Sequence, residues 1–217
     1  MKKRNQKTLY VALCVLLTFV LWTILIRFVD VKTIGPQESA IGFATINGFF
    51  HKLTGINLSL YYVTDWLSLI PLGIVIFFAL LGLIQWIKRK SIKKVDYSIF
   101  ILGGFYITVI AVYLLFETVV INYRPILING NLEVSYPSST TVLVLCVMTT
   151  AIMQLNERLK NKKSKRIIAS VIIAFMIFMI IGRLVSGVHW LTDILGGVIL
   201  SAGLVTLYRY IIGLRQN

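Results

Sequence analysis

Three ionisable residues near the C-terminal end of the chain have the types and the spacing that phosphate chemistry requires. Arg183, His189 and Asp193 follow one another as Arg-x5-His-x3-Asp. If the chain is helical from Val188 onward, His189 and Asp193 share one face, and the carboxylate can hold one ring nitrogen while the other attacks. Arg183 adds a permanent cation whose planar fork of donors suits a phosphate. The spacing therefore predicts a nucleophilic histidine beside an anion-binding arginine.

Two further polar segments precede this one, and both border apolar runs. The first is Asn-Tyr-Arg-Pro, which contains Arg124, and the second is Tyr-Pro-Ser-Ser-Thr-Thr, which begins at Tyr136. A proline followed by hydroxyl residues is typical of a helix N-terminus, where free N–H groups and the helix dipole favour an anion. The expected phosphate ligands are Arg124, Ser138, Ser139 and Thr140. Charged groups beside hydrocarbon are costly, and by default they mark a functional site.

The order of these motifs resembles the type-2 phosphatidic acid phosphatase superfamily, whose members are membrane lipid phosphatases and diphosphatases built on a six-span bundle. The family pattern is Lys-x6-Arg-Pro, Pro-Ser-Gly-His and Ser-Arg-x5-His-x3-Asp, and the third motif is nearly intact here. The resemblance implies that His189 attacks phosphorus to form a phosphohistidine and that Asp193 orients it. It also implies that Arg124, Arg183 and the amides around Ser138–Ser139 neutralise the phosphate oxygens. Water then cleaves the intermediate.

The first two motifs depart from the family pattern. Glu117 stands where the family has its lysine, Ser139 replaces the glycine and Thr140 replaces the histidine. That histidine is the family's general acid, and a threonine hydroxyl is too weak an acid to replace it. Its loss removes a contribution of about 10²–10⁴-fold. Two explanations stay open: Glu117 supplies the proton from a partly desolvated carboxyl, or the substrate is a diphosphate whose leaving group is already a weak base.

Composition assigns the chain to the membrane proteins. Of its 217 residues 58% are hydrophobic and 14% are charged, with a mean hydropathy of +0.86, whereas soluble domains carry about 25% charge. We expect one domain, 1–217. The net charge of +14 does not indicate nucleic acid, because the basic residues cluster in short gaps between apolar runs. Cys14 and Cys146 both lie in apolar runs far apart, so no disulfide framework or thiolate metal site is expected.

The apolar runs predict an all-α membrane protein, a six-transmembrane-helix bundle with a short interfacial helix before the second span. The expected spans are 8–28, 62–87, 97–119, 138–156, 166–182 and 190–212. We interpret the first as an uncleaved span, because its apolar run exceeds a signal-peptide h-region. The 36–59 stretch predicts the interfacial helix, with four apolar side chains dipping into lipid: Ile41, Phe49, Phe50 and Leu53.

The distribution of Lys and Arg predicts the orientation. Seventeen of the 22 basic residues fall in the two tails and in the gaps that follow the second and fourth spans, and five fall in the other three loops. By the positive-inside rule both termini are cytoplasmic and the polar motifs face outward. The expected location is the plasma (cytoplasmic) membrane.

The partners follow from this chemistry. We expect a phospholipid or polyprenyl (pyro)phosphate substrate, no nucleic acid and no obligate protein partner. No cofactor or metal is expected, because no Asp/Glu/His cluster has ligand spacing. The missing family lysine and histidine favour one alternative, a relative that binds lipid phosphate without hydrolysing it. A small transporter is a weaker alternative, because it needs polar residues inside several spans. His51 and Asp65 belong to no motif and are assigned structural roles.

Overall fold

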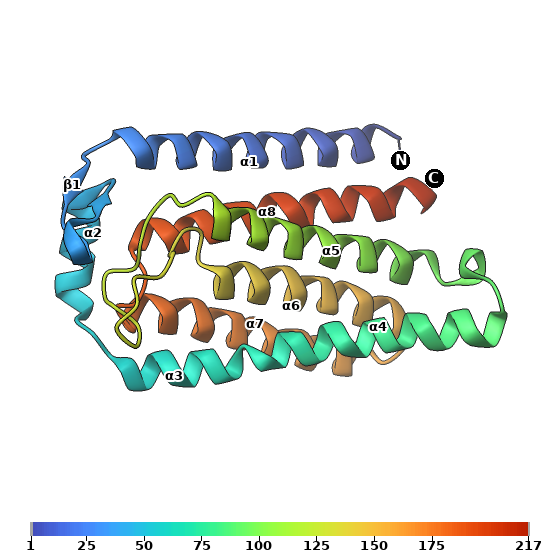
Figure 1. Ribbon diagram of the computed structural model, residues 1–217. Coiled ribbons are helices and arrows are strands. Elements are labelled where there is room, and N and C mark those ends of the chain that lie inside the picture. Colours follow the sequence, from blue (N-terminus) through green and yellow to red (C-terminus); the bar gives the residue numbers. More distant parts are fainter. Residues whose placement is uncertain (1, 217) are drawn as a thin grey trace.

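The computed structural model describes residues 2–216 and is a bundle of long helices (Figure 1). Within these residues, six helical segments are long and apolar enough to cross a bilayer. They are α1 (Lys2–Phe28), α3 with α4 (Leu58–Leu67 and Leu69–Arg89), α5 (Tyr97–Thr118), α6 (Ser139–Arg158), α7 (Lys162–Val185) and α8 (Leu191–Gly213). Short 3₁₀ turns occur at η1 (Pro36–Glu38), η2 (Ile92–Lys94) and η3 (Leu214–Gln216). The predicted all-α, six-span class is confirmed, and the chain is a multi-pass membrane protein.

The second span is two helices that meet at Ser68. Pro71 lies in the first turn of α4, so it cannot donate to the carbonyl of Leu67, and its ring crowds the preceding turn. The pair covers Leu58–Arg89, which is longer than the expected 62–87. Asp65, near the end of α3, lies at the same end of the bundle as the polar loops.

The two most buried spans are α6 and α8. Within each, 56% of the most apolar window is buried, against 28% or less in the other four spans. Close packing at the start of α8 depends on two glycines. A Cβ at Gly196 would lie 2.4 Å from the Tyr136 ring, and one at Gly197 would lie 3.1 Å from Thr141. Small residues of this kind let membrane helices approach closely, and here they bring the N-termini of α6 and α8 together.

A compact segment between α1 and α3 covers the loop end of the bundle. It holds a two-stranded antiparallel hairpin, β1 (Lys32–Thr33) with β2 (Ala40–Ile41), followed by α2 (Ala44–Thr54). Asn47 on α2 donates to the hydroxyl of Thr192 at 2.9 Å and accepts from its backbone N–H at 3.2 Å. These two bonds anchor α2 to the first turn of α8.

The lipid-facing side of this segment differs in part from expectation. Phe49 and Leu53 on α2 are exposed, in agreement with a helix that lies in the membrane interface. Ile41 is fully buried, so its predicted lipid contact is wrong. Side chains alternate along a strand, and this alternation in β2 turns Ala40 outward and Ile41 inward.

Candidate active site

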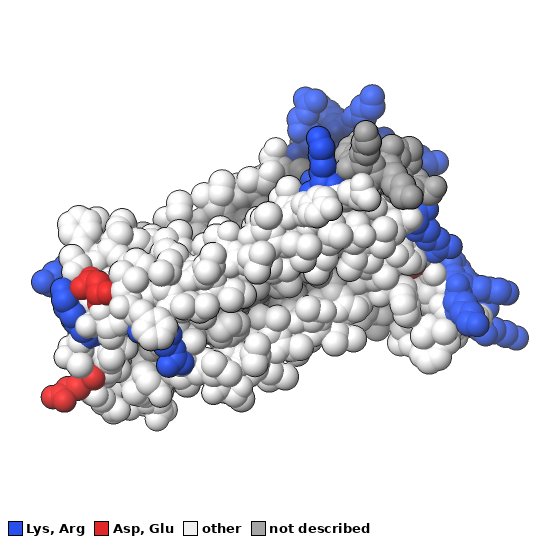
Figure 2. All heavy atoms as spheres, turned by 90° about the horizontal axis from the view of Figure 1, so that it is seen from above, with Lys and Arg blue, Asp and Glu red and all other residues white. Residues whose placement is uncertain are grey.

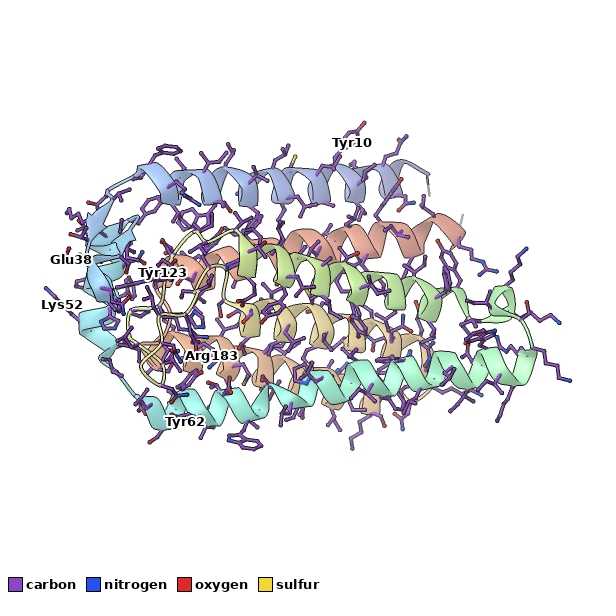
Figure 3. The ribbon with its side chains drawn as sticks, viewed as in Figure 1. Tyr10, Glu38, Lys52, Tyr62, Tyr123 and Arg183 are labelled. Atoms are coloured by element: carbon purple, nitrogen blue, oxygen red, sulfur yellow. The ribbon has the colours of Figure 1, made fainter. Side chains whose placement is uncertain are left out.

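Loops at one end of the bundle carry the predicted motifs, at the end opposite the start of α1 (Figure 3). The 119–138 connection between α5 and α6 folds back on itself. Asn129 and Gly130 both have positive φ, and Ile128 pairs with Asn131 across them, as in a two-residue hairpin turn. Behind this turn, the backbone N–H of Arg124 donates to Glu133, and that of Ser135 donates to Asn122. The fold-back brings Ser135 and Asn122 to the start of α8.

His189 is held by a serine that the sequence analysis did not select. Its Nδ1 lies 2.9 Å from Ser135 Oγ, and Ser135 Oγ lies 2.5 Å from Asp193 Oδ2. The expected shared helical face of His189 and Asp193 is wrong, because α8 begins only at Leu191 and His189 lies in the turn before it. The carboxylate therefore acts on the imidazole through the hydroxyl of Ser135.

The bonds around Asp193 assign the tautomer of His189. Besides Ser135, Asp193 accepts from the backbone N–H of Trp190 at 3.0 Å and from the Asn122 amide at 3.0 Å. An ionised carboxylate only accepts, so the single hydroxyl proton of Ser135 points to Asp193, and Ser135 must accept from His189 Nδ1–H. The Nε2 atom of His189 is then unprotonated. It is buried and has no hydrogen-bond partner among the described residues.

Burial and two neighbouring cations keep this imidazole neutral. His189 is 3% exposed. Loss of hydration is the main cause that lowers its pKa well below the ordinary value, and the charges of Arg124 and Arg183 add to it. A neutral ring with a free Nε2 lone pair is the form required of a nucleophile.

The two predicted arginines converge on one aromatic ring. The guanidinium carbons of Arg183 and Arg124 lie 4.9 Å and 5.8 Å from the centroid of Tyr61 on α3, within cation–π range. Arg183 Nη2 donates to Thr140 Oγ1 and lies 3.1 Å from Asp65 Oδ1. Arg124 Nε lies 3.1 Å from Glu133 Oε2, an ion pair by distance whose N–H is not aligned for a hydrogen bond.

Some N–H donors of Arg124 and Arg183 have no hydrogen-bond partner in the part of the chain that the structure describes. Nη1 of Arg124 and Nε of Arg183 are buried and have no hydrogen-bond partner within residues 2–216. Buried donors without partners are rare and costly. Their position beside His189 marks a place that an anion can fill.

The hydroxyl residues of the second motif separate into two groups. Ser139 and Thr140 line the cavity described below. Ser138 does not, because its Oγ accepts from Thr141 and its N–H donates to the backbone of Asp193. Ser138 is the residue that precedes α6, so the amides of the next three residues have no carbonyl within the helix to bond. The predicted helix N-terminus is present, and Ser138 serves to join it to α8.

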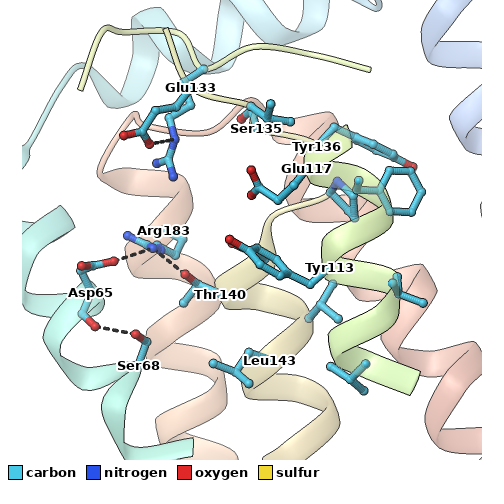
Figure 4. Close-up of a pocket in the computed structure, with 18 of the residues that line it drawn as sticks. Asp65, Ser68, Tyr113, Glu117, Glu133, Ser135, Tyr136, Thr140, Leu143 and Arg183 are labelled. Carbon is cyan, nitrogen blue, oxygen red and sulfur yellow. Dashed lines mark hydrogen bonds and ion pairs between the residues drawn. The ribbon is translucent and has the colours of Figure 1, made fainter. Parts of the chain in front are cut away.

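Carboxylates near the arginines differ from the expected arrangement. Glu117 is exposed and lines the cavity on its α5 side with Tyr113 (Figure 4). The carboxylate that pairs with Arg124 is that of Glu133. Asp65, which we assigned a structural role, contacts Arg183. The Asn129-Gly130 dipeptide is a hairpin signal that could have brought the segment with Glu133 back beside the segment with Arg124, whereas no local pattern marks Asp65.

A cavity of about 820 Å³ lies between α4, α5, α6 and the 119–138 loop (Figure 4). Arg124, Arg183, Ser135 and Thr140 supply polar lining, and His189 is not in the lining but contacts Ser135. Most of the apolar lining comes from three helices: Leu72 on α4, Val109, Ile110, Val112 and Phe116 on α5, and Val142 and Leu143 on α6; the loop adds Leu132, Val134 and Pro137. Within the described part of the chain, no group of three or more His, Cys, Asp or Glu residues could hold a metal ion.

Comparison with known proteins agrees with this geometry. A family model for the PAP2 superfamily matches residues 117–216, the part that carries all three motifs. This part of the chain is therefore similar to the PAP2 superfamily. The fold is similar to that of a transmembrane PAP2 type phosphatidylglycerolphosphate phosphatase from Bacillus subtilis, with a TM-score of 0.61 over 94% of this chain and 96% of that one, at 17% identity. No curated protein sequence matches the chain significantly.

Proposed function

We propose that this protein hydrolyses a phosphate or pyrophosphate group on a membrane lipid at the outer leaflet, through a phosphohistidine intermediate. The observation that carries the proposal is the unpartnered Nε2 of His189 beside the unused donors of Arg124 and Arg183. Ser135, which lines the cavity, also contacts His189, so a nucleophile adjoins the anion site, and the chemistry that joins them is phosphoryl transfer.

The reaction has two steps. Nε2 of His189 attacks phosphorus, the bond from phosphorus to the leaving oxygen breaks, and the ring gains a positive charge. The Nδ1–H bond to Ser135, backed by the Asp193 carboxylate, stabilises that charge. A water oxygen then attacks the phosphohistidine, inorganic phosphate leaves, and the lone pair returns to Nε2. The arginines and the α6 amides neutralise the equatorial oxygens in both steps.

The leaving group favours a diphosphate. Thr140 accepts from Arg183, so its own hydroxyl proton is available to hydrogen-bond a phosphate oxygen, but it is too weak an acid to protonate an alkoxide. A lipid diphosphate releases a lipid phosphate, which needs no proton to depart. A monophosphate releases an alkoxide and must take its proton from Glu117 or from water.

The charge distribution and the cavity lining support a lipid substrate and the outward orientation. Most Lys and Arg side chains visible in Figure 2 gather at the end of the bundle that holds the start of α1 and the end of α8. The positive-inside rule makes that end cytoplasmic in the plasma membrane, so the site faces outward. Apolar side chains of α4, α5 and α6 supply a surface for an alkyl or prenyl chain.

One alternative has its own support. Both arginines contact carboxylates, and His189 is not part of the cavity lining. A protein that binds lipid phosphate without turnover is compatible with this arrangement. No comparable observation favours a transporter.

Phosphate release from a panel of lipid mono- and diphosphates separates hydrolysis from binding. Purified protein in excess EDTA should release phosphate, since arginines neutralise the substrate, and His189→Ala should not. Lipid binding without phosphate release would support the alternative. Loss of activity in EDTA with rescue by Mg²⁺ would contradict the metal-independent mechanism.

Single cysteines test the orientation, after both native cysteines are replaced by alanine. A cysteine at the exposed Asn131 should react with a membrane-impermeant thiol reagent in intact cells, and one at the exposed Asn161 should not. The opposite labelling pattern would place the site in the cytoplasm.

A further inference from the structure

Each arginine of the phosphate site has its own carboxylate partner, and the two carboxylates lie on different elements. Asp65 on α3 contacts Arg183 on α7, and Glu133 in the 119–138 loop contacts Arg124 in the same loop. Glu117 adds a third carboxylate to the cavity lining. Three carboxylates thus line the cavity against two guanidiniums, which leaves one negative charge in excess where a phosphate must enter.

The two partners of each ion pair differ in exposure. The Arg183 side chain is 2% exposed and its partner Asp65 is 53% exposed. The Arg124 side chain is 11% exposed and its partner Glu133 is 40% exposed. Tyr61 packs against both guanidiniums. The cations are therefore held in the protein, whereas each carboxylate is partly exposed and can rotate away from its arginine.

A phosphate and a carboxylate compete for the same donors. Both bind a guanidinium through two oxygens in one plane. Phosphate that enters the cavity can reach Nη1 of Arg124 and Nε of Arg183, which are unused. To take the remaining donors it must replace the carboxylates, and in the reverse direction the returning carboxylates replace the product.

We infer that Asp65 and Glu133 are exchangeable counter-ions that compete with phosphate and promote release of the inorganic product. They act through the arginines and are positioning residues. The inference rests on the phosphate site of the proposed function and adds a role for two residues that the reaction steps do not use. This competition weakens anion binding. Its benefit is that the arginines keep a partner at every stage, so that no buried cation is left unpaired when phosphate departs.

Affinity for inorganic phosphate measures this competition directly. All variants carry His189→Ala, so that no phosphoprotein can form, and binding is followed by calorimetry in detergent. Asp65→Asn and Glu133→Gln should each bind phosphate about 5-fold more tightly than the background, the factor expected for a partly exposed ion pair. The gain should shrink as salt rises. Asp65→Glu keeps the charge and should restore the affinity of the background.

Glu117→Gln is the matched control, because Glu117 lines the same cavity and forms no ion pair among the described residues. It should change phosphate affinity less than either of the other two variants. Weaker or unchanged binding in both Asp65→Asn and Glu133→Gln would overturn the inference. An equal gain in Glu117→Gln would overturn it as well, since the effect would then belong to the general field of the cavity.

The two variants lie on separate elements, so either carries the test if the other does not fold. Lipid hydrolysis by the chain with His189 intact decides the proposed function. Phosphate affinity in the His189→Ala background decides the competition, and the two results can fail independently.

Discussion

The two parts of the site are built in opposite ways. Around His189 each polar atom except Nε2 has a partner, and Ser135 and Asp193 are buried. Around Arg124 and Arg183, donors are unused and the carboxylate partners reach water. The first part resembles a preorganised catalytic unit, in which bonds made at folding cost nothing during the reaction. The second part resembles a binding surface whose counter-ions are meant to be exchanged.

This contrast separates the expected effects of mutation. Changes in the histidine part should reduce the rate of phosphoryl transfer while substrate affinity stays nearly constant. Changes in the carboxylate part should alter anion affinity instead. The predictions below test where the boundary between the two parts lies.

The largest effect is expected at Asp193. In Asp193→Asn the amide can donate as well as accept, so the proton order through Ser135 to His189 is no longer enforced. We expect a loss of about 10⁴-fold in kcat, as for a carboxylate that fixes a catalytic tautomer. Lipid binding by equilibrium dialysis should change little. A loss of affinity with normal kcat would place Asp193 in the binding part.

Ser135→Ala should have a smaller effect on the same step. It removes the hydroxyl that connects Nδ1–H of His189 to the Asp193 carboxylate. We expect kcat to fall about 10²-fold, measured as single-turnover phosphorylation. Ser201→Ala is the control, because Ser201 is a buried serine on α8 whose hydroxyl donates to Gly197 on its own helix and contacts Cys146 on α6, outside the histidine part. If both variants lose the same activity, the loss reflects packing and the bridging role of Ser135 is wrong.

Thr140→His tests the boundary, because Thr140 contacts Arg183 and stands where the family has its acid. An imidazole there should raise turnover of lipid monophosphates up to about 10²-fold and leave diphosphates nearly unchanged. The assay is the ratio of kcat/KM for a lipid monophosphate to kcat/KM for a lipid diphosphate. Thr140→Val, which supplies no acid, should not raise the turnover of lipid monophosphates. An unchanged ratio in Thr140→His would show that leaving-group protonation does not limit the native protein.

The smallest effect is expected from pH. Because the pKa of His189 is lowered in the folded protein, the nucleophilic form persists below about 6.5, the ordinary value. The phosphorylation rate should stay level as pH falls through this range and decline only at lower pH. The unfolded chain protonates His189 first, so this residue's contribution to stability is constant above about pH 6.5 and is lost as pH falls further. An acid limb at or above 6.5 that depends on His189 would contradict its burial as a neutral group.

The sequence predicts much of the fold because lipid imposes a simple rule. A segment that crosses hydrocarbon must be long, apolar and helical, so the spans can be read from hydropathy alone. The Arg-x5-His-x3-Asp motif could be found for a similar reason, since its members lie close along the chain. The break at Ser68 follows from Pro71. Because this proline lies in a continuous apolar run, the prediction treated the run as one unbroken span.

The rest of the site depends on contacts between distant loops. Ser135 is 54 positions from His189, and Asp65 is 118 positions from Arg183. No local periodicity records such pairs. The start of α8 was placed too early for a related reason: the Asp193 carboxylate accepts the Trp190 N–H, which caps the helix and leaves His189 outside it. The sequence does not indicate this cap, because the spacing of His189 and Asp193 equally suggests that the carboxylate contacts the ring.

The central claim is that His189 becomes phosphorylated during turnover. Native protein is mixed with a lipid diphosphate labelled in its terminal phosphate, quenched in base within one turnover, digested and analysed by mass spectrometry. The account predicts an acid-labile, base-stable phosphate on His189 that decays as inorganic phosphate appears, and none in His189→Ala. Hydrolysis by His189→Ala at the native rate, or native turnover with no phosphorylated protein at any time, would contradict it.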